Sequence, residues 1–193
     1  MPTSDREPKT GISSPREDHY LVAASQKSFY VRVIGMATMT NSAGLQEVLA
    51  DFRGRGFRRF IFDLGECTGI DSTFMGTMLG VAMEENVDPG GEERPSGADV
   101  PVTVDLVNAS SYLTDLITGV GIDRVLRLHS EPVELPRMDL RRLQDLPQDP
   151  MRRIRSMVAA HENLVRLGGS NLEKFGAMLD ALRRELGEDP DPN

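Results

Sequence analysis

The stretch RRFIFDLGECTGIDSTFMGTMLG, residues 58–80, decides the fold of this chain. Its first part, at about 58–64, is a short run rich in Phe and Ile, which is typical of a buried strand. The chain then leaves the strand through Gly65 and Gly69, reaches the pair Asp71-Ser72, and continues as an apolar helix. The stripe of that helix expected to face inward consists of Met75, Met78, Leu79 and Ala82. A strand, a turn and a helix in this order are a building unit of α/β domains.

The sequence on either side continues the alternation of strands and helices. Two β-rich runs, at about 20–24 and 28–34, flank a short polar break and predict a hairpin. NSAGLQEVLADFRGRG predicts a helix that Ser42 caps and that glycines end. Further on, VPVTVDLVN predicts a strand, SSYLTDLITGVG a helix and DRVLRLH a last short strand. The sequence therefore predicts an α/β domain whose later strands run parallel, joined by right-handed crossovers.

Two helices at the C-terminal end predict a helical hairpin. The first, at about 150–167, follows Asp149-Pro150, which is a cap followed by proline at the first helical position. The second, at about 171–186, has a capping-box signature in Ser170 and Glu173. Its apolar stripe consists of Leu172, Phe175, Met178, Leu179, Leu182 and Leu186. We expect this stripe to pack on the α/β domain or on a second copy of the chain. The alternative is that the hairpin covers or extends a partner-binding surface.

Composition and charge exclude several classes of protein. The 193 residues carry a net charge of −8, and all of it lies in residues 1–135, with 12 basic and 20 acidic side chains. An acidic surface repels phosphate backbones, so nucleic-acid binding by this part is disfavoured. The single cysteine, Cys67, cannot form an internal disulfide. No apolar run is long enough for a membrane span, and residues 1–18 have no hydrophobic core for a signal peptide. We expect a soluble cytoplasmic protein.

No catalytic constellation is found in the sequence. It has no P-loop, no Rossmann glycine pattern, no G-x-S-x-G elbow and no H-E-x-x-H, so we expect no enzyme, no cofactor and no metal. Cys67 is better explained as a partly buried side chain than as a reactive thiol. Asp63 and Asp71 are weak evidence for a metal site, and His161 is better explained as structural or exposed than as a ligand.

The largest cluster of basic side chains lies near the middle of the chain. It consists of Arg53, Arg55, Arg58 and Arg59. The acidity around it favours a solvated loop between helix and strand over a binding patch.

The pair Asp71-Ser72 is the remaining candidate for a functional site. Asp71 is placed to cap the following helix, and Ser72 falls in its first turn, where we expect it to face solvent. Taken by itself, the pattern is explained more simply by capping than by function. A serine at such a junction is also accessible to another protein's active site, and phosphate there would add a charge of about −1.5 to −2 beside Asp71.

The stretch from about 20 to 130 resembles a STAS domain, the fold of bacterial anti-sigma factor antagonists. The resemblance rests on the order of the elements, on RRFIFDLGECTGIDSTFMGTMLG, which is similar to the family's strand, D-L-x-x-x-x-x-I-D-S-[ST] turn and helix, and on VTVDLVNASSYLTDLITGVGIDRVLRLH. It implies a mixed sheet of about five strands flanked by helices. The chain would then comprise a flexible leader at 1–18, a STAS-like domain at 19–135 and a helical extension at 136–193.

The resemblance also implies a function. In that family the serine after the aspartate is phosphorylated by a serine kinase of the histidine-kinase-like ATPase type, which is also the anti-sigma factor, and a serine phosphatase removes the phosphate. Ser72 would then be the phosphoacceptor, and Asp71, Thr73, Phe74 and Met75 would bind the partner. The alternative is a constitutive STAS subunit of a larger assembly, such as a stress-signalling complex or a lipid-transport ATPase, and the serine at position 72 favours the switch mildly over it.

This sequence departs from the family pattern at two places. Phe74 stands where the family usually has a small residue, which predicts an altered partner fit. The acidic loop at about 86–99 is longer than the family's.

Overall fold

A computed structural model describes residues 17–83, 101–144 and 149–188 of the chain. It contains a six-stranded mixed sheet in the order β5-β4-β3-β2-β1-β6. The strands are β1 (His19–Ser25), β2 (Ser28–Ala37), β3 (Arg59–Ile70), β4 (Thr103–Val107), β5 (Arg127–Leu128) and β6 (Arg141–Arg142). The helices are α1 (Ala43–Gly54), α2 (Ser72–Met83), α3 (Ser111–Val120), α4 (Pro150–Arg166) and α5 (Asn171–Glu185), with a 3-10 turn η1 at Ile122–Arg124. The predicted leader, apart from its last two residues, and the predicted loop at 86–99 lie outside the described residues.

The sheet has the strand directions that the sequence predicts. β1 and β2 form an antiparallel hairpin, whereas β2, β3, β4 and β5 are parallel neighbours. The sixth strand was not predicted: β6 pairs with β1 through only Arg141 and Arg142. Both residues are exposed, and a strand of two residues is too short to show an alternating pattern, so the sequence gives no signal for it.

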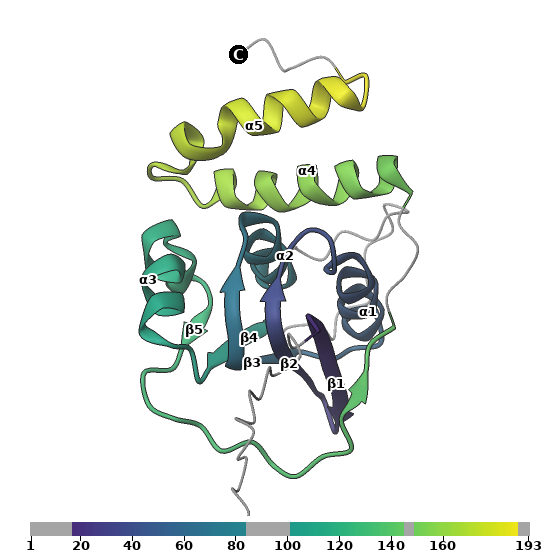
Figure 1. Ribbon diagram of the computed structural model, residues 1–193, viewed down its shortest axis with the longest axis vertical. Coiled ribbons are helices and arrows are strands. Elements are labelled where there is room, and N and C mark those ends of the chain that lie inside the picture. Colours follow the sequence, from purple (N-terminus) through teal and green to yellow (C-terminus); the bar gives the residue numbers. More distant parts are fainter. Residues whose placement is uncertain (1–16, 84–100, 145–148, 189–193) are drawn as a thin grey trace, which may run out of the picture.

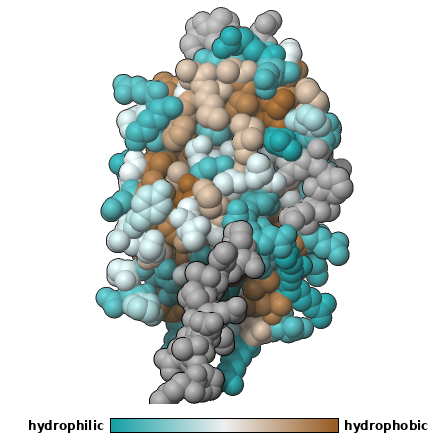
Figure 2. All heavy atoms as spheres, viewed as in Figure 1, coloured by the Kyte–Doolittle hydropathy of each residue, from teal (hydrophilic) through white to brown (hydrophobic). Residues whose placement is uncertain are grey.

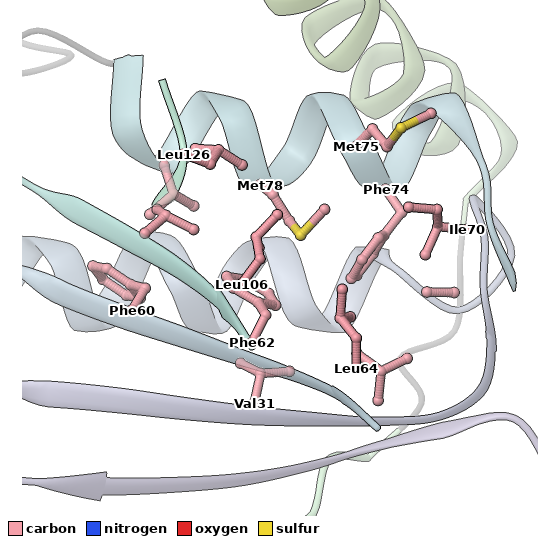
Figure 3. Close-up of a cluster of buried hydrophobic side chains, with 14 of the residues drawn as sticks. Val31, Phe60, Phe62, Leu64, Ile70, Phe74, Met75, Met78, Leu106 and Leu126 are labelled. Atoms are coloured by element: carbon pink, nitrogen blue, oxygen red, sulfur yellow. The ribbon is translucent and has the colours of Figure 1, made fainter. Parts of the chain in front are cut away.

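The main core lies between the sheet and the helices that follow its parallel strands. Alternate residues of β2, β3 and β4 enter it, including Val31, Phe62 and Leu106. Figure 3 shows Phe74 and Met78 of α2 pointing towards the sheet side chains. Burying large apolar side chains in this way contributes about 1.5–3 kcal/mol for each of them. This packing fixes α2, and with it the junction at its start, against the end of β3.

The α4–α5 hairpin lies across the end of the molecule where α2 begins, with α4 between α2 and α5 (Figure 1). Asp149 Oδ1 accepts from the backbone N–H of Met151 at 3.3 Å, so the predicted cap of α4 is confirmed. The predicted capping box of α5 is wrong, because Ser170 makes no side-chain capping bond. Ser42 likewise does not cap α1; its hydroxyl donates to the carbonyl of Thr38 at 2.6 Å.

The apolar stripe of α5 faces mainly α4, and its Phe175 also packs against the main core. Leu179 and Leu182 are buried in a small core with Met157 and Val158 of α4. Leu172 and Met178 remain 63% and 41% exposed. Figure 2 shows apolar side chains gathered over this end of the molecule. The hairpin therefore has a core of its own.

Candidate functional site

Asp71 joins β3 to α2 and uses both oxygens of its carboxylate to do so. Oδ1 accepts from the backbone N–H of Phe74 at 2.8 Å, which caps the helix as predicted. Oδ2 accepts from the backbone N–H of Met39 at 2.7 Å and so holds the loop between β2 and α1 against the same junction. A carboxylate at a helix N-terminus also interacts favourably with the helix dipole. Asp71 thereby fixes the backbone on which the next residue is presented.

Ser72 is the first residue of α2, and its hydroxyl contacts a buried histidine of α4. Ser72 Oγ lies 3.0 Å from Nε2 of His161, and Nδ1 of that ring lies 2.8 Å from the carbonyl oxygen of Met157. A carbonyl oxygen only accepts, so Nδ1 carries a hydrogen, and in the neutral ring Nε2 accepts the hydrogen of Ser72. The expectation that Ser72 faces solvent is corrected: it is half-buried, and His161 is fully buried.

The covering of Ser72 results from close packing of α4 on α2. A β-carbon at Gly76 would overlap the carbonyl oxygen of Ala160 and lie 2.6 Å from its carbonyl carbon, so the two helices cross backbone to backbone here. Asn163 Nδ2 donates to the carbonyl oxygen of Gly76 at 3.2 Å, one turn further along α4. Only a residue without a side chain permits this approach. α4 therefore packs on the α/β domain and covers residues predicted to bind a partner. The stripe of α5, which was predicted to make this packing, lies mainly against α4 and reaches the main core through Phe175.

The other residues predicted to bind a partner are buried in this conformation. Thr73, Phe74 and Met75 have exposed fractions of 3%, 0% and 5%. Phe74 packs edge-on against Phe62, with ring centroids 6.0 Å apart, and stacks on Tyr20 at the same distance. The bulk of Phe74 is thus accommodated inside the domain. A role of these residues in partner binding stays a prediction.

The two aspartates considered for a metal belong to separate networks. Asp63 Oδ2 pairs with Nε of Arg32 at 2.9 Å, and its Oδ1 accepts from Nδ2 of Asn108 at the same distance. Asp71 is occupied by backbone N–H groups. Within residues 17–83, 101–144 and 149–188 no group of three or more His, Cys, Asp or Glu side chains is arranged to hold a metal ion.

Cys67 is a structural thiol in β3. It is buried, and Sγ donates to the carbonyl oxygen of Gly69 at 3.4 Å. Burial raises the pKa of the Cys67 thiol, and the backbone hydrogen bond only partly offsets this. A thiol with a raised pKa carries little thiolate at neutral pH, which agrees with the unreactive role expected from the sequence.

The cluster of arginines does not form one basic surface. Arg55 pairs with Asp51, Arg58 donates to the carbonyl oxygens of Arg53 and Phe57, and Arg53 is buried. Arg59 Nε lies 2.8 Å from Oδ2 of Asp105. Arg55 and Arg58 lie in the loop between α1 and β3 that the sequence predicts, but the expectation is wrong for Arg53, which is buried in α1, and for Arg59, which begins β3.

Asp105 is a buried carboxylate of β4, and both of its oxygens have a partner. His129 Nε2 lies 2.8 Å from its Oδ1, and Arg59 occupies the other oxygen. Burial raises the pKa of Asp105, but the hydrogen bonds from His129 and Arg59 outweigh this and hold the pKa below its usual value. The group is structural, because its partners come from β3 and from the residue after β5.

His161 is the site residue that the sequence did not assign to the site. It lies 89 positions after Ser72, and no motif joins the two. The amphipathic pattern of α4 predicted that His161 lies in a helix with a structural role. The structure adds that its ring contacts the hydroxyl of Ser72. Its ring also meets the edge of Phe175 of α5, with centroids 5.6 Å apart.

Comparison with known proteins adds two solved structures of similar fold. One is an anti-sigma factor antagonist from Mycobacterium paratuberculosis, 15% identical, with a TM-score of 0.44 over 62% of this chain and 92% of that chain. The other is the Bacillus cell fate determinant SpoIIAA in the phosphorylated form, also 15% identical, with a TM-score of 0.41 over 58% of this chain and 92% of that one. No protein-family model and no curated protein matches the chain. Among the described residues, no helix is long and apolar enough to cross a membrane.

Proposed function

We propose that this chain is a STAS-type anti-sigma factor antagonist, a non-catalytic protein-interaction switch with Ser72 as its phosphoacceptor. The observation that carries the proposal is the junction itself: Ser72 begins α2 at the end of β3, directly after Asp71, whose carboxylate caps the helix. The sequence DLGECTGIDS, residues 63–72, supports it through its resemblance to the family's turn. The partner is a serine kinase and anti-sigma factor of the histidine-kinase-like ATPase type, and a serine phosphatase resets the switch.

The proposed mechanism is local and electrostatic. Phosphate on Ser72 adds a charge of about −1.5 to −2 next to the carboxylate of Asp71. Asp71 is held in place by two backbone N–H groups, so it cannot turn away from this charge without losing the helix cap. Docking a partner over the junction then requires burying two negative groups, which costs affinity. A change of a few kcal/mol suffices, since each 1.4 kcal/mol alters the dissociation constant about tenfold.

The first experiment maps phosphate on the chain isolated from its native cells. Mass spectrometry of wild type should locate one phosphate on Ser72, and Ser72→Ala should abolish it. Ser111 is the matched control, because it is also the first residue of a helix and is exposed. A phosphate found on Ser111 and never on Ser72 would count against the proposed site.

The second experiment tests whether phosphate controls the partner. Wild type, Ser72→Ala and Ser72→Asp serve as baits in the native lysate. The proposal expects a kinase-like ATPase on the first two and its loss with Ser72→Asp. The same ATPase on all three baits would show that charge at this position does not govern docking.

One observation favours a second candidate, a constitutive subunit of a larger assembly. Ser72 is half-buried and hydrogen-bonded to His161, so its hydroxyl has a structural use without any phosphate. In such a subunit Ser72 would help to hold α4 on α2, and the partner would bind elsewhere. Native chain without phosphate on Ser72, together with a partner retained by all three baits, would support this candidate.

A further inference from the structure

The α4–α5 hairpin covers most of the outer side of the helix that begins with Ser72, through the packing of α4 on α2. Nine consecutive residues of α2, from Thr73 to Val81, are buried between the sheet on one side and α4 on the other. At the crossing, Gly76 meets the backbone of Ala160, and Gly80 lies against the side chain of Asn163. A second protein cannot reach this side of α2 while the hairpin is in place.

Closure of the hairpin also defines the surroundings of the Ser72 hydroxyl. Oγ is 3.0 Å from Nε2 of a fully buried ring, whose other nitrogen is taken by Met157. A phosphate on Oγ removes the hydrogen that Ser72 donates and adds three oxygens with about two negative charges. It would place them against His161, at the point where α4 contacts α2. Oγ is already within hydrogen-bond distance of Nε2, so a phosphate on Oγ has to replace this contact.

Contacts between α4 and α5 hold the two helices of the hairpin together as one unit. α4 and α5 share their own core of Met157, Val158, Leu179 and Leu182, and Arg183 Nη2 donates to Oε1 of Glu162 at 2.8 Å. Against α1 the packing is incomplete: a cavity of about 220 Å³ lies between α1, α2 and α4, lined in part by Gln46 and Ser156. Residues 129–144 lead towards the hairpin, and they are joined to the sheet at β6 and by backbone hydrogen bonds from His129 to Leu106 and from Leu143 to Tyr20.

Polar contacts hold the hairpin shut in the unmodified chain. Asn171 Nδ2 donates to the carbonyl oxygen of Val120 at 3.1 Å, Lys174 Nζ donates to that of Gly119 at 2.8 Å, and Arg152 pairs with Glu47 of α1. Leu164 of α4 is fully buried in the main core. These contacts all have to break when the hairpin leaves α2.

We propose that the α4–α5 hairpin is a displaceable cap over Ser72 and the outer side of α2, and that a phosphate on Ser72 and the closed cap exclude each other. The physiological source of the phosphate rests on the proposed function. The exclusion itself rests on the contact between Ser72 and His161 and on the crossing at Gly76. Modification of Ser72 then requires the cap to open, and the phosphate keeps it open by removing the contact that closes it. The charge of this phosphate beside Asp71 still opposes docking at the junction, so an open cap without phosphate is the form that binds a partner.

Hydrogen exchange on the full chain tests the exclusion without a kinase. Phosphoserine is installed at position 72 during synthesis, and amide exchange is followed by mass spectrometry. The backbone amides of α4 and α5 should exchange at least tenfold faster than in the unmodified chain, while β2, β3 and β4 keep their protection. Phosphoserine installed at position 111, an exposed first residue of α3, should change neither region.

A glycine substitution opens the cap without any phosphate. Gly76→Ala places a methyl group against the backbone of Ala160 while it raises the helix propensity of α2, so it should reproduce the exchange pattern of phosphoserine 72. Gly54→Ala is the matched control, because no atom lies within 4 Å of a β-carbon there.

Three results would overturn the proposal. If phosphoserine 72 leaves α4 and α5 as protected as in the unmodified chain, phosphate fits beneath the closed cap. If Gly76→Ala leaves them protected, the crossing does not control closure. If the sheet loses protection together with the hairpin, the hairpin is an integral part of the fold and not a cap. A native chain that never carries phosphate on Ser72 would refute the proposed function and leave this test unaffected.

Discussion

The hydrogen bond between Ser72 and His161 makes a quantitative prediction about stability. Ser72→Ala removes the donor and leaves Nε2 of a fully buried ring without a partner. Loss of such a bond costs about 1–2 kcal/mol, because the group left behind has no water to replace it. Alanine in the first turn of α2 returns about 0.5 kcal/mol through its higher helix propensity. We expect a net loss of about 1 kcal/mol in the free energy of unfolding.

A double-mutant cycle separates this bond from the packing around it. His161→Phe keeps a ring of similar size against Phe175 but removes both nitrogens, and we expect it to cost about 2 kcal/mol. In the variant that carries both substitutions, the hydroxyl and its acceptor are absent together. The two costs should therefore overlap, with a coupling of about 1 kcal/mol.

Urea unfolding of the full chain, followed by circular dichroism, measures all four proteins. The slope with urea must stay constant across the set, since a changed slope would mean that the hairpin melts separately. Ser111→Ala provides the control: its serine begins α3 and is exposed, so the substitution should cost less than about 0.5 kcal/mol and should not couple to His161→Phe. Additive costs for Ser72→Ala and His161→Phe, within about 0.3 kcal/mol, would refute a stabilising contact between the two side chains.

Three further substitutions or treatments test the rest of the structure. Phe74→Ala should lower the free energy of unfolding by about 3–5 kcal/mol, because the ring is fully buried; a cost below 1 kcal/mol in urea would place Phe74 at the surface. The lowered pKa of Asp105 contributes stability that is complete above its unfolded value of 3.8 and is lost as pH falls through the folded pKa. The difference in free energy of unfolding between wild type and Asp105→Asn should therefore shrink as pH falls below about 4. Urea titrations at successively lower pH measure this difference. A difference that grows on acidification would contradict the pairing of Asp105 with His129 and Arg59. Cys67 should react with a thiol reagent at least a hundredfold more slowly in the native chain than in urea, and equal rates would show that the end of β3 is open.

The parts of the fold that the sequence predicted are those set by local chemistry. The Phe- and Ile-rich run gave β3, although the strand extends to Ile70, beyond the predicted end at about 64. Asp71 and Asp149 cap helices because the groups that they satisfy lie two or three residues away. Parallel pairing of β2, β3 and β4 follows from the helices between them.

The predictions that failed depend on groups that are distant in sequence or that compete for the same atom. Ser72 was expected in solvent because nothing near it in sequence covers it; its partner is on a helix that begins at Pro150. Ser42 was expected to cap α1, but the carbonyl of Thr38 takes its hydroxyl. Leu172 and Met178 belong to a stripe wider than the surface that α4 offers, so they remain exposed.

The composition of α2 nevertheless indicates that a second element covers the side that faces away from the sheet. STFMGTMLGVAM, residues 72–83, has no charged side chain, and a helix that is apolar all round is buried on all sides. A sheet covers only one side of such a helix, so a second element had to cover the other. Gly76 and Gly80, four residues apart, mark the side on which α4 approaches, with the backbone of Ala160 at Gly76 and the side chain of Asn163 at Gly80. A partner that docks on this side therefore has to replace α4, and its apparent affinity is reduced by the fraction of the chain in which the cap is closed. Affinity measured with Gly76→Ala should then exceed that of wild type for any partner that binds α2, and should equal it for a partner that binds elsewhere.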